Sequence, residues 1–164
     1  MFKTAVYPGD FDPVTKGHLD IIKRGSCIFD CLIVAVQNHS AQHPLFSVSE
    51  RMRLLYKATK GINNIRIDHF NGLLIEYLNH NHYSIVLKGL RTILDFDNEM
   101  AFYLQNKRLN PKVETCFLMA KREYSFVSSN IVKEIAMHEG NLASLVPQAS
   151  EEALQKKFTA KVLS

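Results

Sequence analysis

The sequence predicts an α/β domain in which a parallel sheet of five strands is doubly wound, with helices on both faces. Short apolar runs alternate with amphipathic windows along the chain, which is typical of strands alternating with helices. The run at 31–36 (CLIVAV) is almost wholly apolar, as expected for a strand covered on both faces. A chain of 164 residues with 46% hydrophobic side chains suits one core, so we expect a single domain over residues 1–164.

Four elements are expected in the first sixty residues. They are a strand at 2–7, a helix at 17–29, a strand at 31–36, and a helix that begins near 47 and ends before 61. Pro8 and Gly9 end the first strand. Ser47 and Glu50 form the pattern of a capping box, in which each side chain satisfies the other's backbone N–H.

The alternation continues through the second half of the chain. The expected elements are a strand at 65–70, a helix at 73–79, a strand at 84–87 ended by Lys88 and Gly89, a helix from about 95, a strand at 113–119, a helix from 128–130 to Gly140, and a C-terminal helix from about 150. We expect the Asp95 carboxylate to cap the long helix. Its expected inward side chains are Phe96, Met100, Tyr103 and Leu104.

Charge and cysteine content limit the possible partners. The formal net charge of +4 allows anionic partners in general and favours none of them. Three cysteines without a C-x-x-C pair indicate reduced thiols rather than a disulfide or zinc framework. The apolar runs are far shorter than the ~18–20 residues of a membrane span, so we expect a cytoplasmic protein with no membrane partner. The basic residues are not interleaved with aromatic ones, so we expect no nucleic-acid partner.

Ligands of a doubly wound, Rossmann-like sheet bind beyond the carboxyl ends of its strands. Here those ends lead into residues 9–18, 37–44, 88–91 and 120–130, which are rich in glycines, basic residues and hydroxyls. Neither G-x-G-x-x-G after the first strand nor G-x-x-x-x-G-K-[ST] occurs, which disfavours dinucleotide-binding and P-loop enzymes. Phosphate would therefore need another binding device.

Four residues of these segments, together with Glu99, are candidates for nucleotide chemistry. His18 and the Ser128-Ser129 pair lie at helix starts, where unpaired N–H groups and the helix dipole attract anions. Arg91 could grip a phosphate through its two-pronged guanidinium, and Glu99 could accept from a ribose hydroxyl or organise a cation. Each also has a structural interpretation: a water-facing histidine, a helix cap, a surface ion pair and a first-turn helix acid, respectively.

A set of motifs adds a resemblance to these candidates. It comprises YPG-x-FDP near the start, T-x-G-H at 15–18, F-x-x-x-ER at 46–51, GLR with DF-x-x-E at 89–99, and SFVSSN-x-VKE at 125–134. With these motifs the chain resembles the nucleotidylyltransferase superfamily, and most of all its bacterial phosphopantetheine adenylyltransferases. The similarity extends over nearly the whole chain, in the right order and spacing.

The resemblance implies a reaction and its partners. The implied reaction transfers the adenylyl group of ATP to 4'-phosphopantetheine and gives dephospho-coenzyme A and pyrophosphate. Direct in-line attack by the acceptor's own phosphate requires no protein nucleophile. The resemblance also implies Mg²⁺ dependence, a homohexamer, and coenzyme A as a feedback ligand.

Residue roles follow from the same resemblance. The implied catalytic residues are His18 and Lys88, and no protein ligands to a metal are implied. The implied ATP side consists of Asp10, Phe11, His18, Gly89, Leu90, Arg91, Glu99, Tyr124, Ser125, Phe126, Val127, Ser128, Ser129 and Asn130. The implied acceptor side consists of Asp10, Gln42, Leu74 and Lys88.

Four positions depart from the pattern of the resembled family. Aspartate stands at 10 where threonine is usual, glutamine at 42 for lysine, lysine at 88 for arginine, and asparagine at 130 for serine. The Asp10 and Gln42 changes together make the acceptor side less cationic. Three explanations stay open: Asp10 binds Mg²⁺, nearby basic residues (Lys16, His39, His43) restore the charge, or the acceptor differs. The alternative function is a nucleotide-binding relative with another acceptor or no transfer activity.

Overall fold

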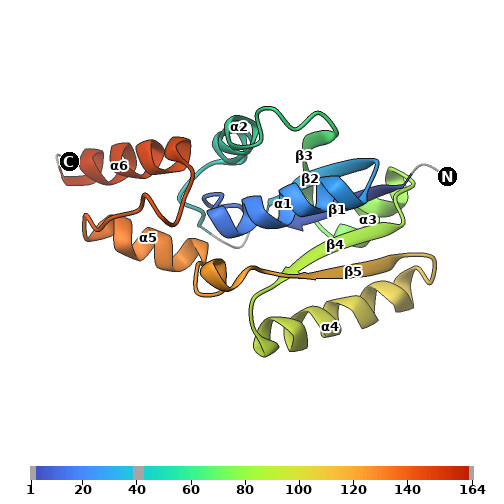
Figure 1. Cartoon of the computed structure of the whole chain (residues 1–164). Helices are drawn as coiled ribbons and strands as arrows, with labels where there is room; N and C mark the ends of the chain where they lie inside the picture. Colours follow the sequence, from blue (N-terminus) through green and yellow to red (C-terminus); the bar gives the residue numbers. More distant parts are fainter. Residues whose placement is uncertain (1–2, 39–42, 163–164) are drawn as a thin grey trace.

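The computed structural model describes residues 3–38 and 43–162, and within them the chain folds around one parallel sheet (Figure 1). The strands are β1 (Thr4–Gly9), β2 (Cys31–Asn38), β3 (Ile65–Asn71), β4 (Ile85–Leu90) and β5 (Glu114–Met119). Their spatial order is β3-β2-β1-β4-β5, so the chain starts in the middle, winds to one edge and then to the other. The predicted single α/β domain with five parallel strands is confirmed.

Helices cover both faces of this sheet. They are α1 (Lys16–Ile28), α2 (Val48–Ala58), α3 (Leu74–His80), α4 (Ile93–Leu109), the 3-10 turn η1 (Arg122–Tyr124), α5 (Ser129–Met137) and α6 (Gln148–Val162). Alternate residues of β2 show the two layers. Leu32 and Val34 join the core that includes α1, α2, α5 and α6, whereas Ile33 and Ala35 join the core that includes α3. The apolar run at 31–36 predicted a strand covered on both faces of the sheet, and this is confirmed.

The fourth strand is longer than expected and contains Lys88 and Gly89. Parallel pairing with β5 sets Lys88 opposite Phe117 and Gly89 opposite Leu118, so Gly89 continues the strand instead of ending it. A Cβ at Gly89 would lie 2.7 Å from Ile21 of α1. The glycine therefore permits close packing of helix on sheet, and it does not mark a turn.

The long helix α4 also departs from its sequence-based expectation. Its N-cap is Thr92, whose hydroxyl accepts from the Asp95 N–H, because the Asp95 carboxylate is occupied by Arg91. None of its residues is buried: Leu104 is 60% exposed, Met100 and Tyr103 are half-buried, and Phe96 is 38% exposed although its ring meets that of Phe117 in β5 edge-on with centroids 5.8 Å apart. The helix covers only β4 and β5 at one end of the sheet, so most of its apolar surface is left open (Figure 1).

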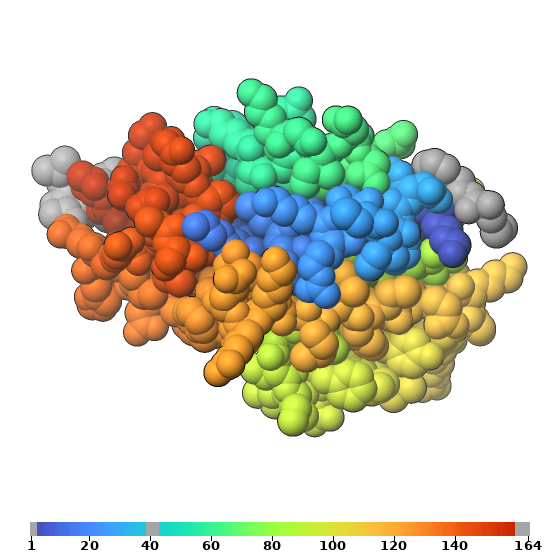
Figure 2. Space-filling model, in the orientation of Figure 1, coloured from blue at the N-terminus to red at the C-terminus, as the bar shows by residue number. Residues whose placement is uncertain are grey.

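Polar contacts join α1 to the end of β5. Arg24 donates to the carbonyl of Met119 and to Asp20, and the Lys121 ammonium lies 3.6 Å from the Asp20 carboxylate. The space-filling view shows the two segments, blue and orange, against each other (Figure 2). All three cysteines are free thiols. Across the described ranges, we find no helix with the length and apolar character of a membrane span.

Candidate active site at the carboxyl ends of the strands

A cleft of about 720 Å³ opens where β1 and β4 end, between the starts of α1 and α5 and the flank of α4. Most of the predicted site residues that the structure describes line it. These are Asp10, Phe11, His18, Leu74, Lys88, Gly89, Arg91, Glu99, Val127, Ser128, Ser129 and Asn130. Gln42 lies outside the described residues. The predicted crevice therefore exists, with residues from five separate chain segments on its walls.

Four predicted residues lie outside the cleft lining. Leu90 is 3% exposed in the core, and Phe126 is 61% exposed at the surface. The Cβ of Tyr124 lies 3.5 Å from where a Cβ on Gly17 would stand, so this side chain packs on the start of α1. Ser125 donates to the carbonyl of Arg122 within η1. The segment predicted over 124–130 thus contributes only its last four residues to the wall.

His18 is held in place by a reciprocal cap at the start of α1. The Thr15 hydroxyl accepts from the His18 N–H at 3.3 Å, and His18 Nδ1 accepts from the Thr15 N–H at 3.1 Å. Because Nδ1 serves as acceptor, the ring proton is assigned to Nε2. The T-x-G-H spacing therefore orients the imidazole and selects its tautomer, with one N–H donor left for the cleft.

The His18 ring is neutral at physiological pH. Burial and, to a smaller extent, the positive charge of Arg91 together lower its pKa to about 4. The Phe11 ring meets the imidazole edge-on with centroids 5.0 Å apart, and Phe11 itself is 1% exposed. The interpretation of a water-facing helix-start histidine is therefore wrong, and Phe11 acts as its packing support.

The start of α5 forms the second predicted anion site. Ser128 is its N-cap and accepts from the Ile131 N–H at 3.2 Å, while the Ser129 hydroxyl donates to the carbonyl of Pro13 at 2.9 Å. Both hydroxyls thus perform structural work. What this helix start offers a ligand is its dipole and its first N–H groups, which have no partner within the helix.

Arg91 is paired with groups of the protein itself. Its Nε and second terminal nitrogen donate to the two Asp95 oxygens at 3.0 and 3.1 Å, and its remaining nitrogen donates to the carbonyl of Val127. Burial by itself raises the pKa of Asp95, but the hydrogen bonds from the side chain and backbone of Arg91 outweigh it, and the pKa lies below its usual value. A phosphate would have to compete with Asp95 for the guanidinium.

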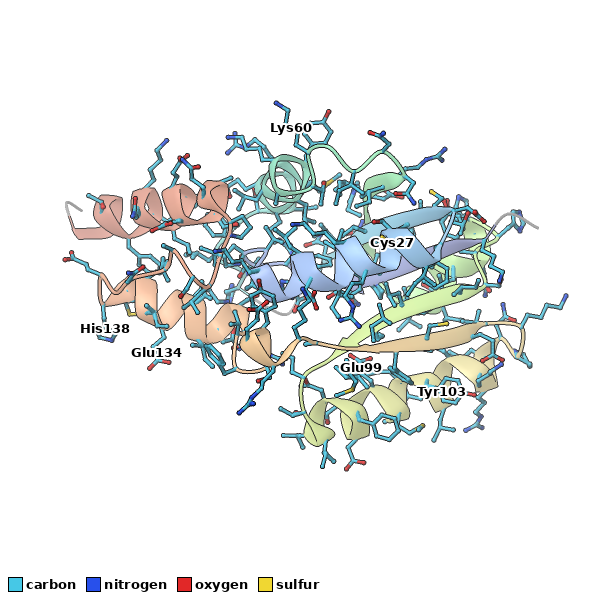
Figure 3. The ribbon with its side chains drawn as sticks, in the orientation of Figure 1. Cys27, Lys60, Glu99, Tyr103, Glu134 and His138 are labelled. Atoms are coloured by element: carbon cyan, nitrogen blue, oxygen red, sulfur yellow. The ribbon has the colours of Figure 1, made fainter. Side chains whose placement is uncertain are left out.

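Lys88 and Glu99 form a second internal pair. The ammonium lies 3.1 Å from the carboxylate, and the two side chains are only 21% and 23% exposed. Glu99 projects from α4 with Tyr103 one turn further on, and both line the cleft (Figure 3). The ammonium of Lys88, which the sequence assigns to the acceptor side, is thus largely neutralised by Glu99, which the sequence assigns to the ATP side.

Comparison with known proteins places this arrangement in a family. The model of the cytidylyltransferase-like family matches residues 6–135. A phosphopantetheine adenylyltransferase of Caldanaerobacter subterraneus subsp. tengcongensis is 51% identical over 156 residues, covering 95% of this chain and 98% of the relative. The chain belongs to the phosphopantetheine adenylyltransferase family. The enzyme of the same name from Carboxydothermus hydrogenoformans is 50% identical, covering 95% and 96%.

A solved structure agrees with this family at the level of the fold. A protein of Vibrio parahaemolyticus described as a nicotinate-nucleotide adenylyltransferase superposes with a TM-score of 0.69 over 96% of this chain and 95% of that chain. At 16% identity the likeness shows the fold alone. The prediction of a nucleotidyltransferase, made from T-x-G-H and its companion motifs, is confirmed.

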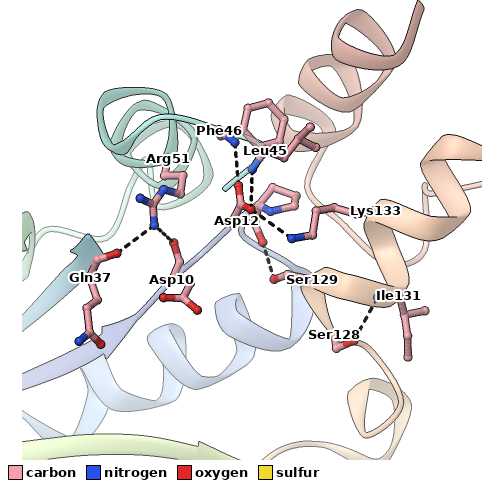
Figure 4. A network of polar contacts seen from close by, with 11 residues as sticks. Asp10, Asp12, Gln37, Leu45, Phe46, Arg51, Ser128, Ser129, Ile131 and Lys133 are labelled. Carbon is pink, nitrogen blue, oxygen red and sulfur yellow. Dashed lines mark hydrogen bonds and ion pairs between the residues drawn. The ribbon is translucent and has the colours of Figure 1, made fainter. Parts of the chain in front are cut away.

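Two buried charges that organise this phosphopantetheine adenylyltransferase site were missed in the sequence. Arg51 is 2% exposed and donates to the carbonyls of Asp10 and Gln37, at 2.8 and 3.0 Å, which ties the ends of β1 and β2 together (Figure 4). The buried Asp12 accepts from the turn before α2. Arg51 and Asp12 both belong to motifs quoted above, but an argument from hydrophobic periodicity assumes that charged side chains lie on the surface and therefore gives no sign that these two are buried.

Proposed function

We propose that the chain transfers the adenylyl group of ATP to 4'-phosphopantetheine, giving dephospho-coenzyme A and pyrophosphate. The names of the relatives, at about half identity over nearly the whole chain, support this activity. The observation that carries it is the neutral His18, whose Nε2–H lies in one cleft with the start of α5 and Arg91. This set can bind a chain of phosphates without offering a nucleophile of its own.

The mechanism follows from what these groups can do. The acceptor is a phosphate monoester and is itself a competent nucleophile, so the enzyme must align it and stabilise charge that develops at the α-phosphorus. His18 donates from Nε2 to an α-phosphate oxygen without losing a proton, since its lowered pKa keeps it neutral. The ammonium of Lys88 stabilises the same charge from the acceptor side.

The leaving pyrophosphate is held on the opposite wall. The first N–H groups of α5 and the guanidinium of Arg91 bind the β and γ phosphates. Arg91 exchanges its two hydrogen bonds to Asp95 for equivalent bonds to phosphate, which keeps its charge satisfied before and after binding. Gly89, Glu99 and residues 127–130, which line the same cleft, complete the nucleotide site.

The donor set suits a magnesium ion that arrives with the nucleotide. Among residues 3–38 and 43–162, no group of three acidic, histidine or cysteine side chains gathers to form a protein cage. Mg²⁺ is commonly bound through one or two carboxylates and substrate phosphates, and the exposed carboxylate of Asp10 in the cleft fits that role. When bound, the ion neutralises phosphate charge.

The acceptor side rests on Asp10, Gln42, Leu74 and Lys88. Leu74 and Lys88 line the cleft near the end of β4, where an apolar arm and a terminal phosphate would enter. The pairing of Lys88 with Glu99 and the carboxylate at position 10 weaken the phosphate contact relative to family members with arginine and threonine. We propose retained transfer activity with weak acceptor binding.

The remaining proposals concern the setting of the enzyme. Cytoplasmic location, a homohexamer and competition by coenzyme A accompany the proposed activity. Exposed apolar residues on α4 support a contact between subunits: Ile93, Leu94, Phe102, Leu104 and Leu109 are all more than half exposed. Light scattering tests the hexamer, and inhibition of turnover by added coenzyme A tests the feedback.

One assay decides the proposed function. Pyrophosphate release is measured with ATP and Mg²⁺, with and without 4'-phosphopantetheine. Acceptor-dependent release supports the transfer reaction. Binding of ATP without release indicates instead a different acceptor or a silent nucleotide-binding relative, and release with pantetheine lacking its phosphate would contradict the proposed nucleophile.

A further inference from the structure

The carboxylate of Asp12 links three segments that are far apart in the sequence. Asp12 is 4% exposed, accepts from the backbone N–H groups of Leu45 and Phe46 at 2.9 and 2.8 Å, and lies 3.1 Å from the Lys133 ammonium (Figure 4). The three segments are the loop after β1, the turn that precedes α2, and helix α5. The Thr15–His18 cap does not use this carboxylate, whose partners are the two backbone N–H groups and the Lys133 ammonium.

Lys133 connects this carboxylate to the start of α5. It follows Ser129 by four residues and therefore lies one turn further along the same face of the helix. Ser129 donates to the carbonyl of Pro13, the residue next to Asp12, so two consecutive turns of α5 bind the same short loop. The position and tilt of the α5 start are thus set by the loop that also leads into His18.

The contact also reaches the acceptor side. Leu45 and Lys133 share one oxygen of Asp12, while Phe46 binds the other. In the sequence the turn at 45–46 comes three residues after position 42, which the proposed function assigns to the acceptor side. The buried Asp12 carboxylate is well satisfied by two N–H donors and an ammonium. Without the ammonium its charge is no longer compensated, so the carboxylate can reorient and lose its hydrogen bonds to the 45–46 turn.

We propose that Asp12 is a positioning residue that fixes the α5 start against the 45–46 turn, and that Lys133 acts on the nucleotide only through this carboxylate. This inference rests on the proposed function for its substrates. It differs from a direct role of Lys133 as a phosphate ligand. That alternative is physically available, because Lys133 lines the cleft and its side chain is 28% exposed.

A double-mutant cycle separates the two roles of Lys133. Wild type, Lys133→Met, Asp12→Asn and the double variant are compared by calorimetric Kd for ATP and by KM and kcat for both substrates. Each single change is expected to weaken ATP binding by at least about fivefold, and the double variant is expected to be no worse than Asp12→Asn. Effects that multiply in the double variant would show that Lys133 touches the phosphates itself.

Two further variants distinguish a positioning role of Lys133 from a general loss of stability. Lys133→Arg keeps the ion pair and should restore Kd and KM to near wild type. Lys107→Met removes a lysine paired with Glu114 at the surface, of similar exposure (25%) and outside the cleft, and should leave both constants unchanged. A lower melting temperature in Lys133→Met without any change in Kd or KM would overturn the proposal.

Hydrogen exchange tests the same coupling without any substrate. In Lys133→Met the amides of Leu45 and Phe46 should exchange about tenfold faster, because their acceptor is no longer held. Unchanged exchange at both amides overturns the proposal, even where Asp12→Asn fails to fold. A wild type that releases no pyrophosphate while Lys133→Met speeds this exchange would refute the proposed function and keep the positioning role.

Discussion

The two halves of the cleft hold their charged groups by different means. On the ATP side, His18 and the start of α5 are fixed by caps that span three residues, Thr15 to His18 and Ser128 to Ile131. On the acceptor side, Lys88 pairs with Glu99 eleven residues away, and Arg51 holds a carbonyl 41 residues away. Local caps orient His18 and the first turn of α5, although Ser129 and Lys133 also anchor α5 over long range, whereas the pairs named on the acceptor side are tertiary contacts.

This difference shows why substitutions gather on one side. A cap fails when either of its two residues changes, so the nucleotide side tolerates little variation. We expect a proposed acceptor side that does not depend on such caps to exchange one charge at a time, as the resemblance implies for positions 10, 42 and 88. The first two of these exchanges leave the acceptor half less cationic, whereas the nucleotide half keeps its donors.

The largest expected effect is on the nucleotide side. His18→Ala removes the Nε2–H donor and should slow the chemical step by about 3–4 kcal/mol, or two to three orders of magnitude. Single-turnover pyrophosphate release measures it, with circular dichroism to verify folding. His18→Gln is the matched control, since its amide N–H can replace Nε2–H, and it should recover part of the loss. Full activity in His18→Ala would remove the histidine from the mechanism.

A smaller effect is expected from restoring charge on the acceptor side. Asp10→Thr with Gln42→Lys should lower the KM for 4'-phosphopantetheine by about fivefold or more, because charges a few ångströms apart near a protein surface interact by about 1–4 kcal/mol. The KM for ATP, measured at the same time, should rise if Asp10 also holds the Mg²⁺ that arrives with the nucleotide, and should otherwise stay the same. Glu152→Gln with Gln155→Lys makes the same change in net charge on α6 and is the control. An unchanged acceptor KM would point to a different acceptor.

The contrast between local and long-range contacts also explains what the sequence could predict. The five strands, the capping box at Ser47 and the T-x-G-H helix start follow from patterns a few residues long, and the structure confirms them. Arg51 could not be found, because a helix position four residues after Ser47 gives no sign that its guanidinium is buried between two strand ends.

Two errors have the same origin. The sequence assigned the Asp95 carboxylate to a helix cap, whereas it pairs with Arg91 four residues earlier, for which an ion pair was the alternative to a phosphate clamp. A helix of weak amphipathic pattern, α4, was given an inward face that the edge of the sheet does not provide, so Leu104 is exposed. For Asp95, the neighbouring side chain of Arg91 competes with the backbone N–H groups for the carboxylate. For α4, the burial of each side chain depends on strands that lie elsewhere in the sequence.

Two helix caps compare the nucleotide side with a site outside the cleft. Ser128→Ala and Ser47→Ala each remove an N-cap hydroxyl and should each cost about 1 kcal/mol of unfolding free energy, or about 2–4 °C in melting temperature. Only Ser128→Ala should also raise the KM for ATP, since the start of α5 would fray where the phosphates bind. Equal KM values for both variants would separate the α5 start from nucleotide binding.

The smallest expected effect is the protonation of His18. Burial, followed by the charge of Arg91, lowers its pKa to about 4. An NMR titration of the histidine rings should therefore show one ring with a midpoint near 4. The absence of that signal from the spectrum of His18→Gln would assign it to His18. Only about a tenth of the rings would be charged at pH 5, so activity should fall little through this group between pH 8 and 5. The unfolded chain takes up the proton near pH 6.5, so the stability that the neutral ring contributes is complete above 6.5 and lost as pH falls through 4. A titration midpoint near 6.5 would mean that the imidazole faces water, and the nucleotide half would then be no better fixed than the acceptor half.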